Sequence, residues 1–263
     1  MERIIRIKYT KEGILRYISH LNLVQIFNRA IRRAGLPVSI SNGFNPRFRI
    51  SFGPPLPLGI NSQAEYLDLR VTEVINLEEV KNRLNQVLPE DLKIIQVQEV
   101  TSSSDSLAKI IDSAAYIIVL KLEKKEESQK RVEDIDQLST SLVKDKDEIE
   151  SPGEKTIIHY PGGNPLESLN REIGCFLRQR EMIIDKPIPG GLKRINIRPF
   201  ILTMRGISYS KGILELELYL SIGPRGNIHP RYIVEYWLNQ SPYQGEILQV
   251  SRQELYIQGR AVM

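Results

Sequence analysis

The chain has 263 residues, a net charge of +4 and a hydrophobic fraction of 41%. This apolar fraction is enough for a packed core and excludes an intrinsically disordered chain. A single cysteine excludes an internal disulfide and any cysteine-rich metal or iron–sulfur site made by this chain alone. No apolar run has the length of a signal peptide or a membrane span. We therefore expect a globular cytoplasmic protein that does not enter membranes.

The positive charge is concentrated in residues 1–50. This segment carries ten lysines and arginines against two acids, a net charge of +8. Because the chain total is +4, residues 51–263 sum to −4. A basic block is typical of a protein that binds a polyanion, although a solvated surface has the same composition. The positions of the arginines distinguish a polyanion-binding surface from a solvated one.

The first half, residues 1–104, is predicted to run strand, helix, strand, strand, helix, strand. Residues 3–10 alternate apolar and charged side chains, as a half-buried strand does. Ser19 is a suitable N-cap for a helix that ends at Gly35, before Pro37. The other expected elements are strands at 37–41, 47–52, 64–72 and 92–100 and a helix at 77–88.

The second half, residues 105–263, repeats this order more loosely around a charged insertion at 123–161 that we expect to be mobile. Its expected elements are strands at 114–122, 181–187, 192–204, 212–220 and 246–257 and helices at 165–180 and 229–239. The two halves together predict an α+β protein made of two tandem ferredoxin-like (βαββαβ) units with antiparallel sheets.

The loop "SNGFNPRFR" (residues 41–49) is the first candidate site. Arginine suits bidentate contact with phosphate, and a glycine-containing loop offers backbone N–H groups to the same anion. An aromatic side chain on the loop could stack on a base, whereas Phe48 and Phe52 are expected in the core. The candidate residues here are Asn42, Gly43, Phe44, Asn45, Arg47 and Arg49.

Two further groups of basic residues are predicted to extend this anion-binding surface. Arg29, Arg32 and Arg33 share the polar face of the first helix, because residues three and four apart lie on one side of a helix. The second group occupies the corresponding place in the second half, where "KRINIRPF" echoes "PRFRISF". It consists of Lys193, Arg194 and Arg198.

His20 is the candidate catalytic residue. At the first turn of a helix, the macrodipole lowers the pKa of an imidazole and leaves a neutral base. A neutral base beside arginines is sufficient for metal-independent RNA cleavage, in which the 2′-hydroxyl is the nucleophile. Packing or capping is the alternative role for this histidine. The sequence has no Walker loop, dinucleotide fingerprint, nucleophile elbow or zinc-binding spacing, so we expect no metal site.

Residues 14–69 carry a dense set of motifs that resembles one bacterial family, the radical SAM-linked proteins. These motifs are "ISHLN", "RRAGLP", "GFNP", "PLPLG" and "EYLDL", and "GLKRINIRPFI" (191–201) is similar to the family's second landmark. The sequence departs from the family pattern at Asn22, where the family has aspartate, and at Arg47, where it usually has histidine. Both departures weaken acid–base chemistry and leave anion binding intact.

The resemblance implies a separate radical SAM enzyme as the partner, and a role in tRNA or rRNA modification or in ribosome-related metabolism. S-adenosylmethionine and an iron–sulfur cluster would belong to that partner, because this chain lacks the three-cysteine cluster of such enzymes. Three hypotheses follow: an RNA-binding module that presents RNA to the partner, a metal-independent endoribonuclease with His20 as base, and a protein-interaction scaffold. None of them involves DNA.

Overall fold

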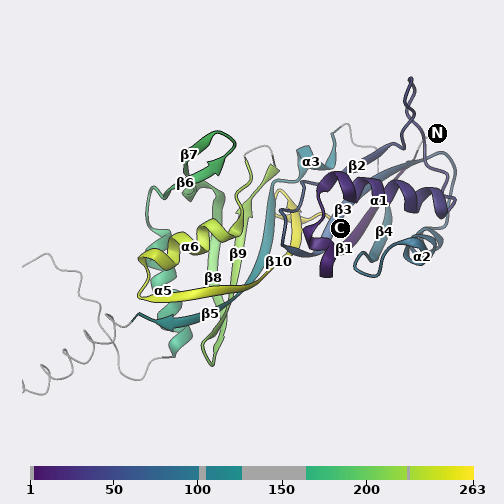
Figure 1. Cartoon of the computed structure of the whole chain (residues 1–263). Coiled ribbons are helices and arrows are strands. Elements are labelled where there is room, and N and C mark those ends of the chain that lie inside the picture. The colour runs from purple at the N-terminus through teal and green to yellow at the C-terminus, as the bar shows by residue number, and fades with distance from the viewer. Residues whose placement is uncertain (1–2, 101–104, 126–163, 224–225) are drawn as a thin grey trace, which may run out of the picture.

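The computed structural model describes residues 3–100, 105–125, 164–223 and 226–263 (Figure 1). The predicted insertion at 123–161 therefore lies outside the described residues, apart from 123–125. Residues 123 and 124 end strand β5 (Ser113–Lys124), which is slightly longer than predicted.

The first half follows the predicted order of elements, except that the predicted strand at 37–41 was wrong, because this segment makes only isolated bridges at Val38 and Ile40. It consists of β1 (Arg3–Lys11), the 3-10 helix η1 (Gly13–Tyr17), α1 (His20–Arg33), β2 (Ile50–Phe52), β3 (Asn61–Val71), α2 (Leu77–Val87) and β4 (Ile94–Val100). Helix α1 begins where predicted, because Ser19 Oγ accepts the N–H of Asn22 at 3.2 Å. It ends at Arg33 with Ala34 as its C-cap, and the following Gly35 adopts the left-handed conformation (φ 61°) that glycine tolerates best.

The second half contains the remaining elements. They are α3 (Leu107–Ile110), β5, α5 (Pro165–Leu177), β6 (Ile183–Ile188), β7 (Gly191–Asn196), the 3-10 helix η2 (Arg198–Phe200), β8 (Ile201–Ser210), β9 (Ile213–Ser221), α6 (Pro230–Gln240), β10 (Tyr243–Ile257) and β11 (Arg260–Ala261). The predicted single strand at 192–204 is divided into β7, η2 and β8, because Pro199 has no N–H to donate to a ladder.

One sheet runs through both halves, in the order β4-β1-β3-β10-β5-β9-β8, with β2 also on β3 and β11 on β10. The α+β class and the mostly antiparallel pairing are therefore confirmed. The expectation of two separate sheets was wrong. Strand β10 joins the halves, since it pairs antiparallel with β5 and makes a short parallel contact with β3 at Ser251 and Arg252.

The length of β10 explains this joining. Its 15 residues span about 50 Å at roughly 3.3 Å per residue, which is enough to reach both halves (Figure 1). The sequence pattern predicts a strand here but does not reveal its neighbours. Because β10 has three strands on each side of it in the sheet order, Arg252 lies in the middle of the nine-stranded sheet.

Two hydrophobic cores flank the sheet. The smaller core lies under α1 and α2 and includes Phe27, Ile31 and Leu84. The larger core lies under α5 and α6 and also takes in Ala64 and Tyr66 of β3. Because β3 contributes to both cores, the halves are connected by packing as well as by strand pairing.

Candidate functional site

A hairpin-like loop at residues 41–47 projects beyond the end of the sheet (Figure 1). Its base is closed by a bridge between Ile40 and Phe48, and the N–H of Ser41 donates to the Arg47 carbonyl at 2.8 Å. The side chain of Phe44 is fully exposed, at 106% of its reference area. The rest of the segment 42–47 is exposed as well. The loop therefore presents its side chains to solvent.

One of the three arginines of α1 contacts the base of this loop. Arg29, Arg32 and Arg33 are all exposed, and the Arg32 guanidinium lies over the Phe48 ring at 6.0 Å. This cation–π contact holds the helix against the base of the loop. We call the resulting surface the basic end. It consists of Arg29, Arg32, Arg33, Asn42, Gly43, Phe44, Asn45 and Arg47.

Arg49 does not join the basic end. Phe48 faces α1 and packs on the smaller core, and successive side chains of an extended chain point to opposite faces. Arg49 consequently faces the other side of the sheet, where it lines a pocket with Arg6 and Arg70. The prediction that Arg49 lies near the α1 arginines was wrong for this reason.

The second-half residues also lie elsewhere. Lys193 and Arg194 are exposed on the β6–β7 hairpin, at the opposite end of the molecule from the 41–47 loop (Figure 1). Arg198 serves the fold, because its guanidinium donates to the carbonyls of Leu177 and Ile201 at 3.0 Å each. The predicted continuous surface is therefore divided between the two ends of the sheet.

His20 opens onto a small cleft between α1, the sheet and the 53–56 segment. Tyr9, Lys11 and Glu65 line the same cleft, whose volume of about 10 Å³ is room for one water molecule. The His20 ring packs edge-to-face on Phe52 at 5.4 Å. Burial lowers the pKa of His20, Lys11 lowers it further and Glu65 opposes both. The predicted direction agrees, but the main cause is burial instead of the helix dipole.

Lys11 is a residue of this cleft that the sequence analysis missed. Its side chain is buried and its Nζ donates to the Ile18 carbonyl at 3.1 Å. Burial lowers the pKa of Lys11, partly offset by Glu65. A signal was available, because Lys11 continues the buried alternation of Ile7 and Tyr9 along β1. A lysine at a core position of a strand indicates a special environment.

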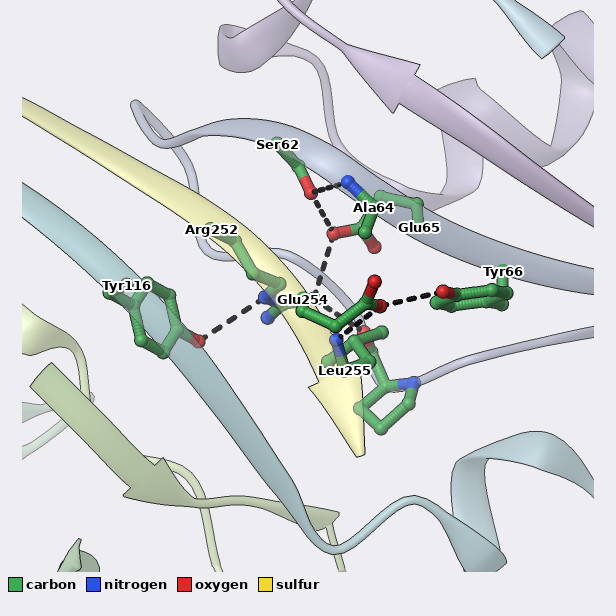
Figure 2. Close-up of polar contacts among 9 residues, drawn as sticks. Ser62, Ala64, Glu65, Tyr66, Tyr116, Arg252, Glu254 and Leu255 are labelled. Atoms are coloured by element: carbon green, nitrogen blue, oxygen red, sulfur yellow. Dashed lines mark hydrogen bonds and ion pairs between the residues drawn. The ribbon is translucent and has the colours of Figure 1, made fainter. Parts of the chain in front are cut away.

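Beneath the cleft, Arg252 forms a buried network, which we call the seam. Figure 2 shows its guanidinium between Glu65 of β3 and Tyr116 of β5. Nη1 donates to Glu65 at 2.9 Å and to the Pro54 carbonyl at 3.3 Å, and Nε donates to the Tyr116 hydroxyl at 3.3 Å. Ser62 donates to the same carboxylate at 2.6 Å. Nη2 has no hydrogen-bond partner among the described residues.

A second carboxylate extends the seam toward β1. Glu254 accepts the Tyr66 hydroxyl at 2.6 Å (Figure 2). It also accepts the Lys8 ammonium at 2.6 Å. Burial and this hydrogen bond raise the pKa of Tyr66 far above its usual range, so Tyr66 stays a neutral donor. Glu65 and Pro54 belong both to the seam and to the wall of the His20 cleft. The cleft therefore rests on the junction of the two halves.

Residues 4–230 match the model of a protein family described as "Uncharacterized protein conserved in bacteria (DUF2344)". The chain belongs to this family. No curated protein matches the chain. Within the described ranges, no helix is long and apolar enough to cross a bilayer. In the same ranges, no three histidine, cysteine or acidic side chains are grouped as metal ligands would be.

Several solved structures resemble the chain at 8% sequence identity. A chain of a Cbf5-Nop10-Gar1 complex matches with a TM-score of 0.45 over 95% of this chain and 48% of that one. A chain of the archaeal box H/ACA sRNP Nop10-Cbf5 complex matches at 0.40 over 94% and 46%. An unknown protein from Galdieria sulphuraria matches at 0.25 over 94% and 98%. The family member thus spans about half the length of the first two, and similarity at these scores does not extend to function.

Proposed function

We propose that this family member binds single-stranded RNA through its basic end. The observation that carries the proposal is Phe44, which is wholly exposed on a projecting loop held against an arginine-bearing helix. An aromatic side chain in water suits base stacking, which contributes about 1–3 kcal/mol per base in single-strand complexes. Guanidinium groups beside it suit the phosphates of the same strand.

The geometry of the basic end fits a flexible strand better than a duplex. Arg29, Arg32 and Arg33 lie within about one helical turn of one another, so they address a short stretch of backbone. The exposed amides of Asn42 and Asn45 flank the aromatic ring in the sequence and carry both donors and acceptors. Sequence-specific RNA recognition reads unstacked bases through such contacts.

We further propose that a separate radical SAM enzyme modifies the bound RNA, with S-adenosylmethionine and the iron–sulfur cluster held by that enzyme. This proposal is supported by the motifs in residues 14–69. It places the protein in tRNA or rRNA modification or in ribosome-related metabolism. We also propose that residues 1–104 and 105–263 are two ferredoxin-like units, because β4-β1-β3-β2 and β10-β5-β9-β8 have equivalent strand orders.

RNA binding is tested by fluorescence anisotropy of a labelled single-stranded oligonucleotide across a salt series. The double variant Arg29→Gln/Arg47→Gln should bind more weakly, and its log–log salt slope should fall by about 0.7 for each lost phosphate contact. The matched control is Lys193→Gln/Arg194→Gln, which removes two exposed charges from the other end of the molecule and should leave binding unchanged.

Two results would refute this proposal. Equal losses in the two double variants would mean that binding follows net charge and not the basic end. The absence of RNA binding by the unmodified protein at physiological salt would leave the basic end as a surface for an acidic protein partner.

A second candidate function is metal-independent RNA cleavage, favoured by the shared cleft of His20, Lys11 and Glu65. The neutral imidazole would accept the proton of a 2′-hydroxyl. The 2′-oxygen would then attack the adjacent phosphorus, forming a 2′,3′-cyclic phosphate and expelling the 5′-oxygen of the next nucleotide. Cleavage in EDTA that yields cyclic phosphate ends and disappears in His20→Gln would support this activity. Intact RNA after prolonged incubation would exclude it.

A further inference from the structure

A pocket of about 230 Å³ lies on the face of the sheet opposite α1, separate from the basic end and from the His20 cleft. Strands β1 and β3, the segment 49–51 and the approach to α3 surround it. Three of its lining residues are arginines: Arg6, Arg49 and Arg70. None of the functions proposed above uses this pocket.

Strand register explains how these arginines meet. In the β1–β3 ladder, Arg6 is opposite Asp68 and Ile4 is opposite Arg70. In the β2–β3 ladder, Ser51 is opposite Asp68. Arg49 precedes that ladder by one residue and accepts the N–H of Arg70 at its carbonyl, at 3.2 Å. Alternating side chains then place all of these residues on the same face of the sheet.

The charges of the pocket favour an anion. Arg6 is 8% exposed and is oriented by a bidentate pair with Asp68, at 2.8 and 3.0 Å. Asp105 is the other acid of the lining, so three guanidinium groups face two carboxylates and the formal net charge is +1. Arg49 and Arg70 are neighbours across two strands, so two of the three guanidinium groups come from adjacent positions.

The size and the remaining walls of the pocket restrict the ligand. Its volume is below the usual range of pockets for drug-sized molecules, but it exceeds the volume of a phosphate group alone. Ile4 and Val100 provide an apolar wall beside the arginines, and Ser51 and Ser106 provide hydroxyl groups. We propose that this pocket binds a phosphomonoester, with Arg49 and Arg70 as its phosphate ligands and the apolar wall against the attached group.

Two sources could supply this chemistry: a free phosphorylated metabolite, or the terminal phosphate of an RNA strand. The proposal rests on the pocket alone and does not depend on RNA binding at the basic end. The probe for the first source is adenosine 5′-monophosphate, titrated calorimetrically into the full chain, with adenosine as the matched ligand that lacks phosphate. We expect binding of the monophosphate only.

The variants Arg49→Gln and Arg70→Gln should each weaken monophosphate binding by about tenfold or more, since a charge-assisted hydrogen bond is lost. Arg49→Lys keeps the charge but not the bidentate geometry, so its affinity for the monophosphate should lie between those of the unmodified protein and Arg49→Gln. Arg29→Gln, on the basic end, should bind as the unmodified protein does. Thermal unfolding of each variant shows whether it is folded, and Arg49→Lys remains informative if Arg70→Gln is not.

The second source is tested with one oligonucleotide carrying either a 5′-phosphate or a 5′-hydroxyl. A gain of about tenfold from the phosphate that disappears in Arg49→Gln would assign the pocket to an RNA end. Monophosphate binding without that gain would assign it to a free metabolite.

Two results would overturn the proposal. The first is that the monophosphate does not bind and the 5′-phosphate does not change oligonucleotide affinity. The second is that Arg49→Gln and Arg70→Gln change neither monophosphate affinity nor the gain from the 5′-phosphate. Arg29→Gln/Arg47→Gln should lose oligonucleotide affinity while keeping monophosphate binding, which separates this proposal from the proposed function.

Discussion

The seam and the basic end use the same side chain for opposite purposes. At the seam, the Arg252 guanidinium is fully buried and bonded to Glu65, Tyr116 and a backbone carbonyl. At the basic end, Arg29 and Arg33 are exposed on a helix that packs through its other face. A buried arginine fixes neighbouring strands, whereas an exposed one is available to a ligand. Burial and partners, more than residue type, therefore separate structural from functional arginines in this chain.

The largest expected effect is a loss of stability when the buried arginine of the seam is removed. Arg252→Met leaves the Glu65 carboxylate buried without its guanidinium partner, so the free energy of unfolding should fall by about 3–5 kcal/mol. Arg33→Met, at the basic end, should change it by no more than about 0.5 kcal/mol. Urea denaturation measures both. If the two variants lose similar stability, the distinction between the regions fails. Arg252→Met/Glu65→Met should recover part of the loss.

The next effect concerns the exposed ring of the basic end. Phe44→Ala should weaken single-stranded RNA binding by about 1–3 kcal/mol, because a stacking platform is removed. Its free energy of unfolding should stay within about 0.5 kcal/mol of the unmodified protein. Anisotropy and urea denaturation on the same sample give the two numbers. A stability loss without a binding loss would show that Phe44 packs in solution and does not contact RNA.

Glu172 is an intermediate case between the buried, paired groups of the seam and the exposed groups of the basic end. It is a half-buried carboxyl group whose Oε2 has no hydrogen-bond partner among the described residues. Burial raises its pKa to about 7 from the usual 4.5, with Lys124 opposing. The folded state therefore binds the proton more tightly, and Glu172 lowers the free energy of unfolding as pH rises from about 4.5 to about 7. Glu172→Gln should remove this decline and stabilise the protein by about 1–2 kcal/mol above pH 7, after allowance for partial exposure. Urea denaturation at pH 4.5 and pH 8 measures it; equal effects at both pH values would contradict the assignment.

The smallest effect belongs to His20, at the edge of the seam. Its pKa is lowered by burial, so below about 6.5 the unfolded state binds more protons. The free energy of unfolding should fall as pH decreases through that value, and His20→Gln should make the fall shallower. The half-buried His229 has a lowered pKa as well, so His229→Gln is the matched control with an independent contribution. No change of slope in His20→Gln would mean that its imidazole titrates as if exposed.

Much of the basic end could be predicted from the sequence, because its signals are local. The Ser19 cap, the glycine after α1 and the loop around Phe44 are all read from neighbouring residues. Arg49 was misplaced although strict alternation from Phe48 separates their side chains. Lys193 and Arg194 were misplaced because equivalent positions in two similar halves need not be neighbours in space.

The seam could not be predicted by such means. Arg252 and Glu65 are 187 residues apart, and nothing near either residue in the sequence indicates its partner. Arg252 lies on a strand whose middle position in the sheet depends on pairing between the two halves. Lys11 is the intermediate case, since its buried position follows from the alternation of β1 but its contact with Ile18 does not.

The position of β10 has a consequence for synthesis of the protein on the ribosome. Its neighbours β3 and β5 emerge long before residues 243–257, so each waits with an open hydrogen-bonding edge beside hydrophobic side chains. The nascent chain also contains Glu65 before Arg252, its ion-pair partner, has been synthesised. Contacts this distant in sequence form slowly. We therefore expect chains interrupted before Tyr243 to aggregate or to bind chaperones, while their first helix and hairpins are already formed.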